Sequence, residues 1–393
     1  MSTPLVMLIG GQRIAFVVWR DSGVMRVLSR AASRLRPVVS AEPADTEASA
    51  AEATDLQETP FVGVEEPAGY LYHYTSAAGL IGIVNSRREE IASRQLTFYA
   101  SDLLLMNDIS ELAFGFGIVR EHAELLAQDE ESIKAFSDWL LTVDKYFKAP
   151  TLDSLRLEPR PCLCAASFTT SDDLLSQWVT YGAGGGFALG LDSRTLSKGK
   201  YTGHNVRTGE SHAFKSALMR VYYGDEARSR IKEIPLFTGP GAIGLPIVTI
   251  LQSLVSGLEA FSDWSKDPQK RRPANVVEHA STAVGIGFAA QSKHDAFEAE
   301  KEWRLLVGGE SLGDLVKLLS GHYPPNFRTS GTRLLPYRPI TITATEGQPV
   351  IRDLIVGPAP DQVQHVHAAQ QLLIANGHDP SVVRASPIPY RGW

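Results

Sequence analysis

The order of strand-like and helix-like segments is the feature that most limits what this chain can fold into. Strands, rich in β-branched and aromatic residues, are predicted at 71–75, 95–101, 162–169, 185–192, 217–224, 300–308, 339–344, 351–357 and after 381. Helices are predicted at 76–87, 107–128, 130–147, 172–182 and 361–377. Because strands and helices do not alternate one for one, the pattern favours an α+β fold over a doubly wound parallel sheet.

Composition divides the 393 residues into three parts. Residues 37–68 are rich in Ala, Glu, Thr and Pro and hold few large apolar side chains, so we expect a disordered linker. Residues 1–36 form an N-terminal segment of uncertain order, in which 1–23 suit a small hairpin and 24–36 suit a short basic helix. One domain then spans 69–391, and two long apolar helical segments predict a helical insertion at 225–294.

Composition also argues against several classes of protein. The net charge of −6, from 38 basic and 44 acidic side chains, gives no strong signal for a nucleic-acid partner. No apolar run approaches the ~20 residues of a transmembrane segment. Cys162 and Cys164 are interpreted as small buried side chains in a reducing compartment, so we expect a cytoplasmic location. No histidine spacing predicts a metal site, and no G-x-S-x-G motif predicts a serine hydrolase.

A histidine stands where the first strand of the main domain gives way to a helix. The stretch LYHYTS, residues 71–76, carries His73 in its middle and ends in Thr75 and Ser76. Ser76 is a plausible helix N-cap. A histidine between tyrosines is more often a structural side chain than a ligand, so both interpretations of His73 stay open.

A glycine-rich run follows the segment that contains Trp178 and Tyr181. Glycines occupy 182 and 184–186, where they let the backbone bend and let another group approach closely. The run follows a helix and precedes a strand, which is the reverse of a dinucleotide fingerprint, and it lacks the Lys-Ser or Lys-Thr of a P-loop. It is therefore either a flexible turn or a wall where Trp178 and Tyr181 face a flat ligand.

The segment FEAEKEWRLLV, residues 297–307, is expected to be a strand with Glu298, Glu300, Glu302 and Arg304 on one face. One interpretation is an exposed edge with alternating charge. The other is a site in which a carboxylate row and an arginine shift one another's pKa values, as acid or base catalysis requires. We favour the second interpretation, because the opposite face of this strand is large and apolar.

In this order, the motifs resemble a widespread bacterial family that carries a domain-of-unknown-function label. The stretches that carry the resemblance are LYHYTS with GLIGI, NDISE, SFTTSDDLLSQWVTYGAGGGFALGLD, FEAEKEWRLL, LIVGP and SPIPYR. The resemblance covers residues 70–391, with a poor match over 225–294. That family is distantly similar to ADP-ribosyltransferases of the His-Tyr-Glu kind, which clamp NAD in the cleft of a split, mostly antiparallel sheet.

The resemblance implies an ADP-ribosyltransferase-like split mixed or antiparallel sheet with flanking helices and a helical insertion. His73 would hydrogen-bond the adenosine ribose of NAD, Thr75 would lie beside the nicotinamide, and Tyr181 would stack on the nicotinamide ring. Glu300 or Glu302 would be the catalytic glutamate, and the sequence does not distinguish between them.

NAD would be consumed as a substrate, and no metal is expected. An aromatic face attracts the cationic nicotinamide, and a carboxylate stabilises the oxocarbenium-like ribose that its departure leaves. Arg304 would bind the diphosphate or orient the glutamates. The implied activity is transfer of ADP-ribose to an unidentified macromolecule, or NAD hydrolysis, and a defence or toxin role is compatible with it. Two alternatives stay open: a non-catalytic module that binds a nucleotide or partner, and a two-carboxylate hydrolase of another glycosidic or nucleotide bond.

Overall fold

The structure describes most of the main domain and three short N-terminal segments. The computed structural model describes residues 4–9, 12–21, 24–30, 67, 69–84, 95–105, 111–126, 134, 137–138, 162–182, 185–233, 287–319, 322–330, 332–344 and 348–389. Most of the linker predicted at 37–68, the helix predicted at 130–147 and the insertion predicted at 225–294 therefore lies outside the described residues. Residues 107–110 and 390–393 lie outside them as well.

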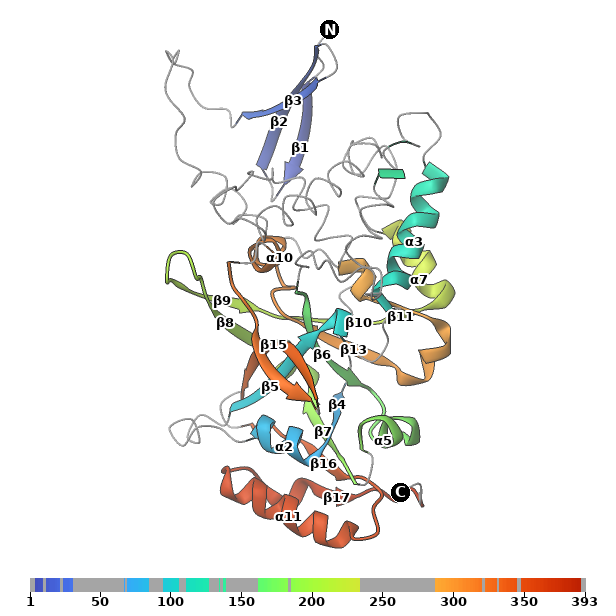
Figure 1. Cartoon of the computed structure of the whole chain (residues 1–393), viewed down its shortest axis with the longest axis vertical. Coiled ribbons are helices and arrows are strands. Elements are labelled where there is room, and N and C mark those ends of the chain that lie inside the picture. The colour runs from blue at the N-terminus through green and yellow to red at the C-terminus, as the bar shows by residue number, and fades with distance from the viewer. Residues whose placement is uncertain are drawn as a thin grey trace.

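A large mixed sheet forms the centre of the main domain (Figure 1). Its strands are β4 (Tyr70–Thr75), β5 (Gln95–Asp102), β6 (Cys164–Thr169), β7 (Phe187–Asp192), β8 (Lys200–His204), β9 (Ser211–Lys215), β10 (Ala217–Arg220), β13 (Glu302–Leu306), β14 (Asn326–Ser330), β15 (Arg333–Thr343), β16 (Asp353–Val356) and β17 (Val383–Ala385). They lie in the order β17-β16-β7-β4-β6-β5-β15-β8-β9, with β13 and β10 joined at β6 and β14 joined at β15. β16 and β17 run parallel, whereas β4 and β5 pair antiparallel with β6. With the helices around it, this sheet confirms the predicted α+β class.

Helices and short elements surround this sheet. They are α2 (Ala77–Val84), η3 (Leu103–Leu105), α3 (Glu111–Leu126), α5 (Leu175–Tyr181), α6 (Ser193–Leu196), α7 (Gly224–Arg230), η5 (Ile231–Glu233), η6 (Asp295–Glu300), α10 (Leu312–Leu319), α11 (Gln362–Ala375) and η7 (Pro380–Val382), with a parallel pair of β11 (Tyr222–Tyr223) and β12 (Ser292–Lys293). Ser76 caps α2 as predicted, because its Oγ accepts a hydrogen bond from the Gly79 amide at 3.2 Å. Leu80 and Ile83 of α2 and Leu373 of α11 enter the main hydrophobic core of the sheet.

The sheet divides along β6. One edge of β6 pairs over most of its length with β13. The other edge pairs with two different strands, at Thr169 with Tyr72 of β4 and at Cys164 and Ala165 with β5. Neither of these two ladders includes residues 166–168, so β4 and β5 diverge along the middle of β6.

Two predicted elements are wrong. Residues 24–30, expected in a basic helix, form β3 (Val24–Arg30), which pairs antiparallel with β2 (Gln12–Asp21), as does β1 (Pro4–Ile9). Strand pairing with the adjoining hairpin supplies backbone hydrogen bonds that outweigh the weak helical pattern of this segment. The strand expected over 297–307 begins only at Glu302. The preceding residues form the 3₁₀ helix η6, which ends at Lys301 with a left-handed φ of 45°.

Cys164 is buried and Cys162 half-buried, and their Sγ atoms lie 3.3 Å apart as free thiols. This agrees with their interpretation as small packing residues, although Cys162 keeps some exposure. Within the described ranges, no helix combines the length and the apolar character needed to cross a lipid bilayer.

Candidate active site

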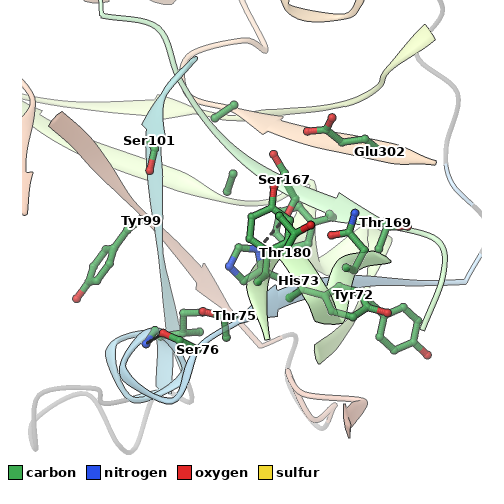
Figure 2. Close-up of a pocket in the computed structure, with 18 of the residues that line it drawn as sticks. Tyr72, His73, Thr75, Ser76, Tyr99, Ser101, Ser167, Thr169, Thr180 and Glu302 are labelled. Atoms are coloured by element: carbon green, nitrogen blue, oxygen red, sulfur yellow. Dashed lines mark hydrogen bonds between the residues drawn. The ribbon is translucent and has the colours of Figure 1, made fainter. Parts of the chain in front are cut away.

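A cavity of about 380 Å³ lies where β4 and β5 diverge from β6. β4, β5 and β6 contribute its inner wall, and α2 and α5 contribute residues from the flanking helices. Both strands of the β14–β15 hairpin contribute another side. Among the lining residues are His73, Thr75, Tyr181, Glu300 and Glu302. Five of the seven residues predicted from the sequence therefore share one cavity. Three of the five, His73, Thr75 and Glu302, are labelled in Figure 2.

The imidazole of His73 is fixed on one side and open on the other. Its Nδ1 lies 2.8 Å from the carbonyl oxygen of Ser167, in the stretch of β6 that neither β4 nor β5 pairs with. Because a carbonyl only accepts, Nδ1 carries the proton and Nε2 is left as an acceptor. The ring packs between Phe98 and Phe168, with centroids 5.2 and 5.4 Å away. In Figure 2 the second ring nitrogen points away from β6, on the side that Tyr99 and Ser101 line.

The environment of His73 keeps it neutral. Burial lowers its pKa and the positive charge of Arg328 lowers it further, while the hydrogen bond to Ser167 acts in the opposite direction. In the described part of the chain, no side chain or backbone group forms a hydrogen bond with Nε2. His73 can therefore accept a hydrogen bond from a ligand hydroxyl without changing its charge.

Two carboxylates share one lysine at another part of the cavity. Lys293 Nζ donates to Glu300 Oε2 at 2.7 Å and to Glu302 Oε2 at 3.1 Å. Arg304 also holds Glu302, since its Nε donates to Oε1 at 2.9 Å and its Nη2 donates to Oε2 at 3.1 Å. Tyr223 fixes the backbone of Glu302, because its hydroxyl accepts a hydrogen bond from the Glu302 amide at 2.8 Å.

These contacts give the two glutamates different properties. Burial alone would raise the pKa of Glu302, but the charges of Arg304 and Lys293 outweigh it and hold this pKa at about 2. Glu302 is therefore an ionised carboxylate with a fixed orientation, and its side chain is only 6% exposed. The side chain of Glu300 is 25% exposed and stands at the end of η6. Glu300 is the more accessible of the two.

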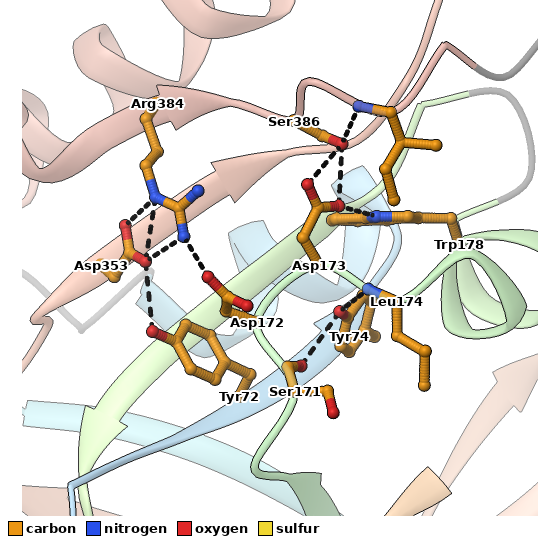
Figure 3. Close-up of polar contacts among 11 residues, drawn as sticks. Tyr72, Tyr74, Ser171, Asp172, Asp173, Leu174, Trp178, Asp353, Arg384 and Ser386 are labelled. Carbon is orange, nitrogen blue, oxygen red and sulfur yellow. Dashed lines mark hydrogen bonds and ion pairs between the residues drawn. The ribbon is translucent and has the colours of Figure 1, made fainter. Parts of the chain in front are cut away.

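The aromatic wall is made by Tyr181 and not by Trp178. Tyr181, the last residue of α5, is 37% exposed and lines the cavity. Trp178 is 2% exposed and lies outside the cavity lining, against Tyr74 at a ring distance of 4.6 Å. Its Nε1 donates to Asp173 Oδ1 at 2.5 Å, and Asp173 also accepts from the Ser386 hydroxyl (Figure 3). The prediction that Trp178 faces a ligand is wrong, because this network and the core occupy both its ring and its polar atom.

Arg304 is also absent from the cavity lining. Its side chain is 0% exposed, and it donates to the carbonyl of Ala290 as well as to Glu302. From the sequence, Arg304 was expected either to bind the diphosphate of NAD or to orient the glutamates, and only the second role fits its position. Arg304 orients a glutamate, and it cannot reach a diphosphate in the cavity.

The glycine run packs against the backbone at the ends of α5 and β4. A Cβ on Gly186 would lie 2.5 Å from the Gly182 Cα and 2.8 Å from the Thr75 carbonyl oxygen. Gly185 adopts a left-handed φ of 109°. The close approach that the glycines permit is therefore between the end of α5, the start of β7 and the end of β4. It brings Tyr181 and Thr75 to the same cavity.

Two arginines of the cavity were not predicted. Arg328 of β14 and Arg333 of β15 both line it, and Arg328 Nη2 donates to Ser101 Oγ at 3.0 Å. The signal that could have found them is the Ser-Gly-Thr turn at 330–332 between two strand-like stretches, which is a hairpin pattern.

No cluster of three or more His, Cys, Asp or Glu side chains suited to a metal ion occurs among the residues described. Comparison with known proteins adds no assignment: no protein-family model, curated protein or solved structure matches the chain.

Proposed function

We propose that this protein consumes NAD by cleaving the nicotinamide–ribose bond, with transfer of ADP-ribose to a macromolecular acceptor or to water. The observation that carries the proposal is the single cavity that collects His73, Thr75, Tyr181, Glu300 and Glu302 from three distant parts of the chain. These are positions that the resemblance to His-Tyr-Glu ADP-ribosyltransferases implies. The division of the sheet at β6, with flanking helices, supports an ADP-ribosyltransferase-like fold.

Each group has a role that follows from its environment. Neutral His73 accepts a hydrogen bond from a ribose hydroxyl through Nε2. The exposed ring of Tyr181 attracts the cationic nicotinamide through its π face. When the bond between the ribose C1′ and the nicotinamide nitrogen breaks, its electron pair neutralises the nicotinamide, and positive charge develops on the ribose. A hydroxyl of the acceptor or a water then attacks C1′ and loses its proton.

A carboxylate stabilises the positive ribose, and the two glutamates are unequal candidates for this task. Glu302 already uses both oxygens on Arg304 and Lys293. Glu300 is more exposed and is held through Lys293. We assign the direct contact with substrate to Glu300, and to Glu302 the task of fixing Lys293 and the local charge.

The test measures nicotinamide released from NAD by the purified protein, using chromatography. We expect Glu300→Gln to lower the turnover by about 10²–10³-fold, the usual effect of removing one group that stabilises transition-state charge. Glu298→Gln is the matched control, because Glu298 belongs to the same 3₁₀ helix and is exposed outside the cavity. Undiminished turnover in Glu300→Gln, Glu302→Gln and their double variant would falsify the proposal.

The Glu302 variant needs a stability measurement beside it. Replacing Glu302 leaves Arg304 and Lys293 buried without their shared carboxylate, which costs about 3–5 kcal/mol when one partner of a buried pair is removed. A thermal melt separates lost folding from lost catalysis. Glu300→Gln leaves the Glu302–Arg304 pair intact and therefore gives the cleaner measure of catalysis.

The same ion-pair network favours a second candidate, a non-catalytic nucleotide-binding module. Glu302 lies between two buried cations, an arrangement that also suits a purely structural carboxylate. This candidate predicts that NAD raises the melting temperature while no nicotinamide appears, in wild type and in Glu300→Gln alike.

A further inference from the structure

Two arginines enter the cavity from the β14–β15 hairpin, away from the carboxylates. Arg328 is held by Ser101 of β5, which pairs with Ala165 of β6. Glu302 pairs with Thr169, near the other end of β6. The two positions on β6 are separated by roughly 13 Å of extended strand. The carboxylates and the guanidinium groups thus approach the cavity from different ends of β6.

Neither arginine has a counter-ion in the described part of the chain. No carboxylate there lies within ion-pair distance of Arg328 or Arg333, in contrast to Arg304 and Arg384, which are both paired. The Nε of Arg328 is buried and has no hydrogen-bond partner among the described residues. Arg328 is thus a guanidinium without a counter-ion in the wall of the cavity, and an anionic ligand there would offset its charge.

The chemistry of these groups selects the ligand. A guanidinium presents parallel N–H groups that match two oxygens of a phosphate, and two guanidiniums match the two charges of a diphosphate. Tyr99 lines the same cavity and is partly exposed, with its ring packed on Tyr337 at 4.8 Å. It offers a flat surface next to Ser101, where a base can stack.

We infer that Arg328 and Arg333 form a phosphate subsite that takes the diphosphate of a nucleotide. The choice of a nucleotide diphosphate rests on the proposed function, whereas the recognition of phosphate rests on the arginines alone. The subsite replaces Arg304 as the group that meets the diphosphate. It also orients the ligand, with the phosphates near the hairpin and the reacting ribose near Glu300.

Calorimetric titration of the full chain with ADP and with adenosine tests this subsite without any NAD cleavage. We expect ADP to bind at least 10-fold more tightly than adenosine. Arg328→Gln and Arg333→Gln should each weaken ADP binding by about 10-fold or more, because each removes a charge-assisted hydrogen bond. Adenosine binding should change little. Arg207→Gln is the control for charge, since Arg207 lies in an exposed turn away from the cavity.

A lysine variant and a melting curve complete the design. Arg328→Lys keeps the charge but loses the paired N–H groups, so its affinity for ADP should fall between those of wild type and Arg328→Gln. The subsite is overturned if wild type does not distinguish ADP from adenosine, or if folded Arg328→Gln/Arg333→Gln binds ADP as wild type does. Arginine-dependent ADP binding without nicotinamide release would uphold the subsite and remove the proposed NAD cleavage.

Discussion

At the scale of the residue, the tautomer of His73 follows from one backbone carbonyl. The middle of β6 has no strand partner on the side of β4 and β5, and His73 Nδ1 supplies the hydrogen bond that the Ser167 carbonyl would otherwise lack. The same bond fixes the tautomer and turns Nε2 into an acceptor. The structural bond to Ser167 thus leaves an acceptor open on the same ring, and the structural and ligand-binding interpretations from the sequence are not exclusive.

Two substitutions of His73 separate these roles. Asparagine can place its amide N–H near the position of Nδ1 and keep the bond to Ser167, but it has nothing at the position of Nε2. We expect His73→Asn to remain folded and to weaken NAD binding by about 10-fold, from the loss of one net hydrogen bond of ~1 kcal/mol and some packing. Glutamine reaches the position of Nε2 and should weaken binding less. Calorimetric titration with NAD measures both, and equal affinity of His73→Asn and wild type would contradict a role for Nε2.

The sequence predicted the residues of the cavity unevenly. Four of them could be predicted because each stands in a motif that carries the resemblance: His73, Tyr181, Glu300 and Glu302. Lys293, which does not line the cavity but binds both glutamates, was not predicted, because its link to them depends on the fold of η6. No sequence pattern predicts that a lysine before a 3₁₀ helix will bind two glutamates at and after the end of that helix.

At the scale of the element, α5 is fixed by contacts with the first strand of the main sheet, β4, and with the segment after the last strand, β17. Trp178 packs on Tyr74 of β4, and its indole shares Asp173 with Ser386, just after β17 (Figure 3). Arg384 of β17 bonds both Asp353 and Asp172, so it holds the segment before α5 to the C-terminal strands. These contacts bury Trp178 in the middle of α5 and leave the last residue of the helix, Tyr181, at the cavity.

A substitution in the glycine run tests this arrangement. The Cβ of Gly186→Ala would overlap the Gly182 Cα and the Thr75 carbonyl, both of them backbone atoms that cannot rotate away. We expect a loss of about 1–3 kcal/mol in the free energy of unfolding, the usual cost of overpacking. Gly117→Ala in α3 is the control, because a Cβ there meets nothing within 4 Å and alanine favours a helix. Urea unfolding of both variants measures the difference, and equal midpoints would contradict the close packing of α5 on β4.

Elements were predictable where local pattern and packing agree. β4, β6 and β16 combine apolar and β-branched residues, and the sequence located each of them within a few positions. β8, β9 and α10 were missed, and so was β14. The short strands KYTGH and SHAFK alternate weakly, and their strand form depends on pairing with each other and with β15. The stretch Asp295–Glu300 has no β-branched residue, and it forms the 3₁₀ helix η6 in place of the start of the expected strand.

At the scale of the whole molecule, the divided sheet explains why the cavity holds opposite charges without neutralising them. β13 lies on one edge of β6 and brings Glu302, while β5 on the other edge leads to the β14–β15 hairpin and its arginines. Sequence predicts strands, but the register that separates β4 from β5 depends on tertiary pairing. The polarity of the cavity was for that reason not predictable from the strand pattern.

Buried titratable groups should limit the stability of the fold on both sides of neutral pH. On the acid side, the lowered pKa values of His73 and Glu302 mean that the unfolded chain binds protons first. Stability should therefore fall as the pH drops below 6.5 for His73, and again between 4.5 and about 2 for Glu302. On the alkaline side, burial raises the pKa of Tyr72 from 10.0 to about 12, so stability should fall as the pH rises through this range.

Variants assign the His73 and Tyr72 limbs of this profile. The free energy of unfolding in urea, measured from pH 4 to pH 11, should reach a plateau between about 6.5 and 10. His73→Asn removes the titrating imidazole, so its curve should fall less steeply than that of wild type just below pH 6.5. Tyr72→Phe removes the phenol and loses only its hydrogen bond of 3.3 Å to Asp353, so its curve should flatten above pH 10. Parallel curves for wild type and His73→Asn between pH 6.5 and 5 would show that His73 is not held neutral by the fold. Below pH 6.5 the cavity would then present an imidazolium, which donates from both nitrogens and cannot accept a hydrogen bond from a ribose hydroxyl.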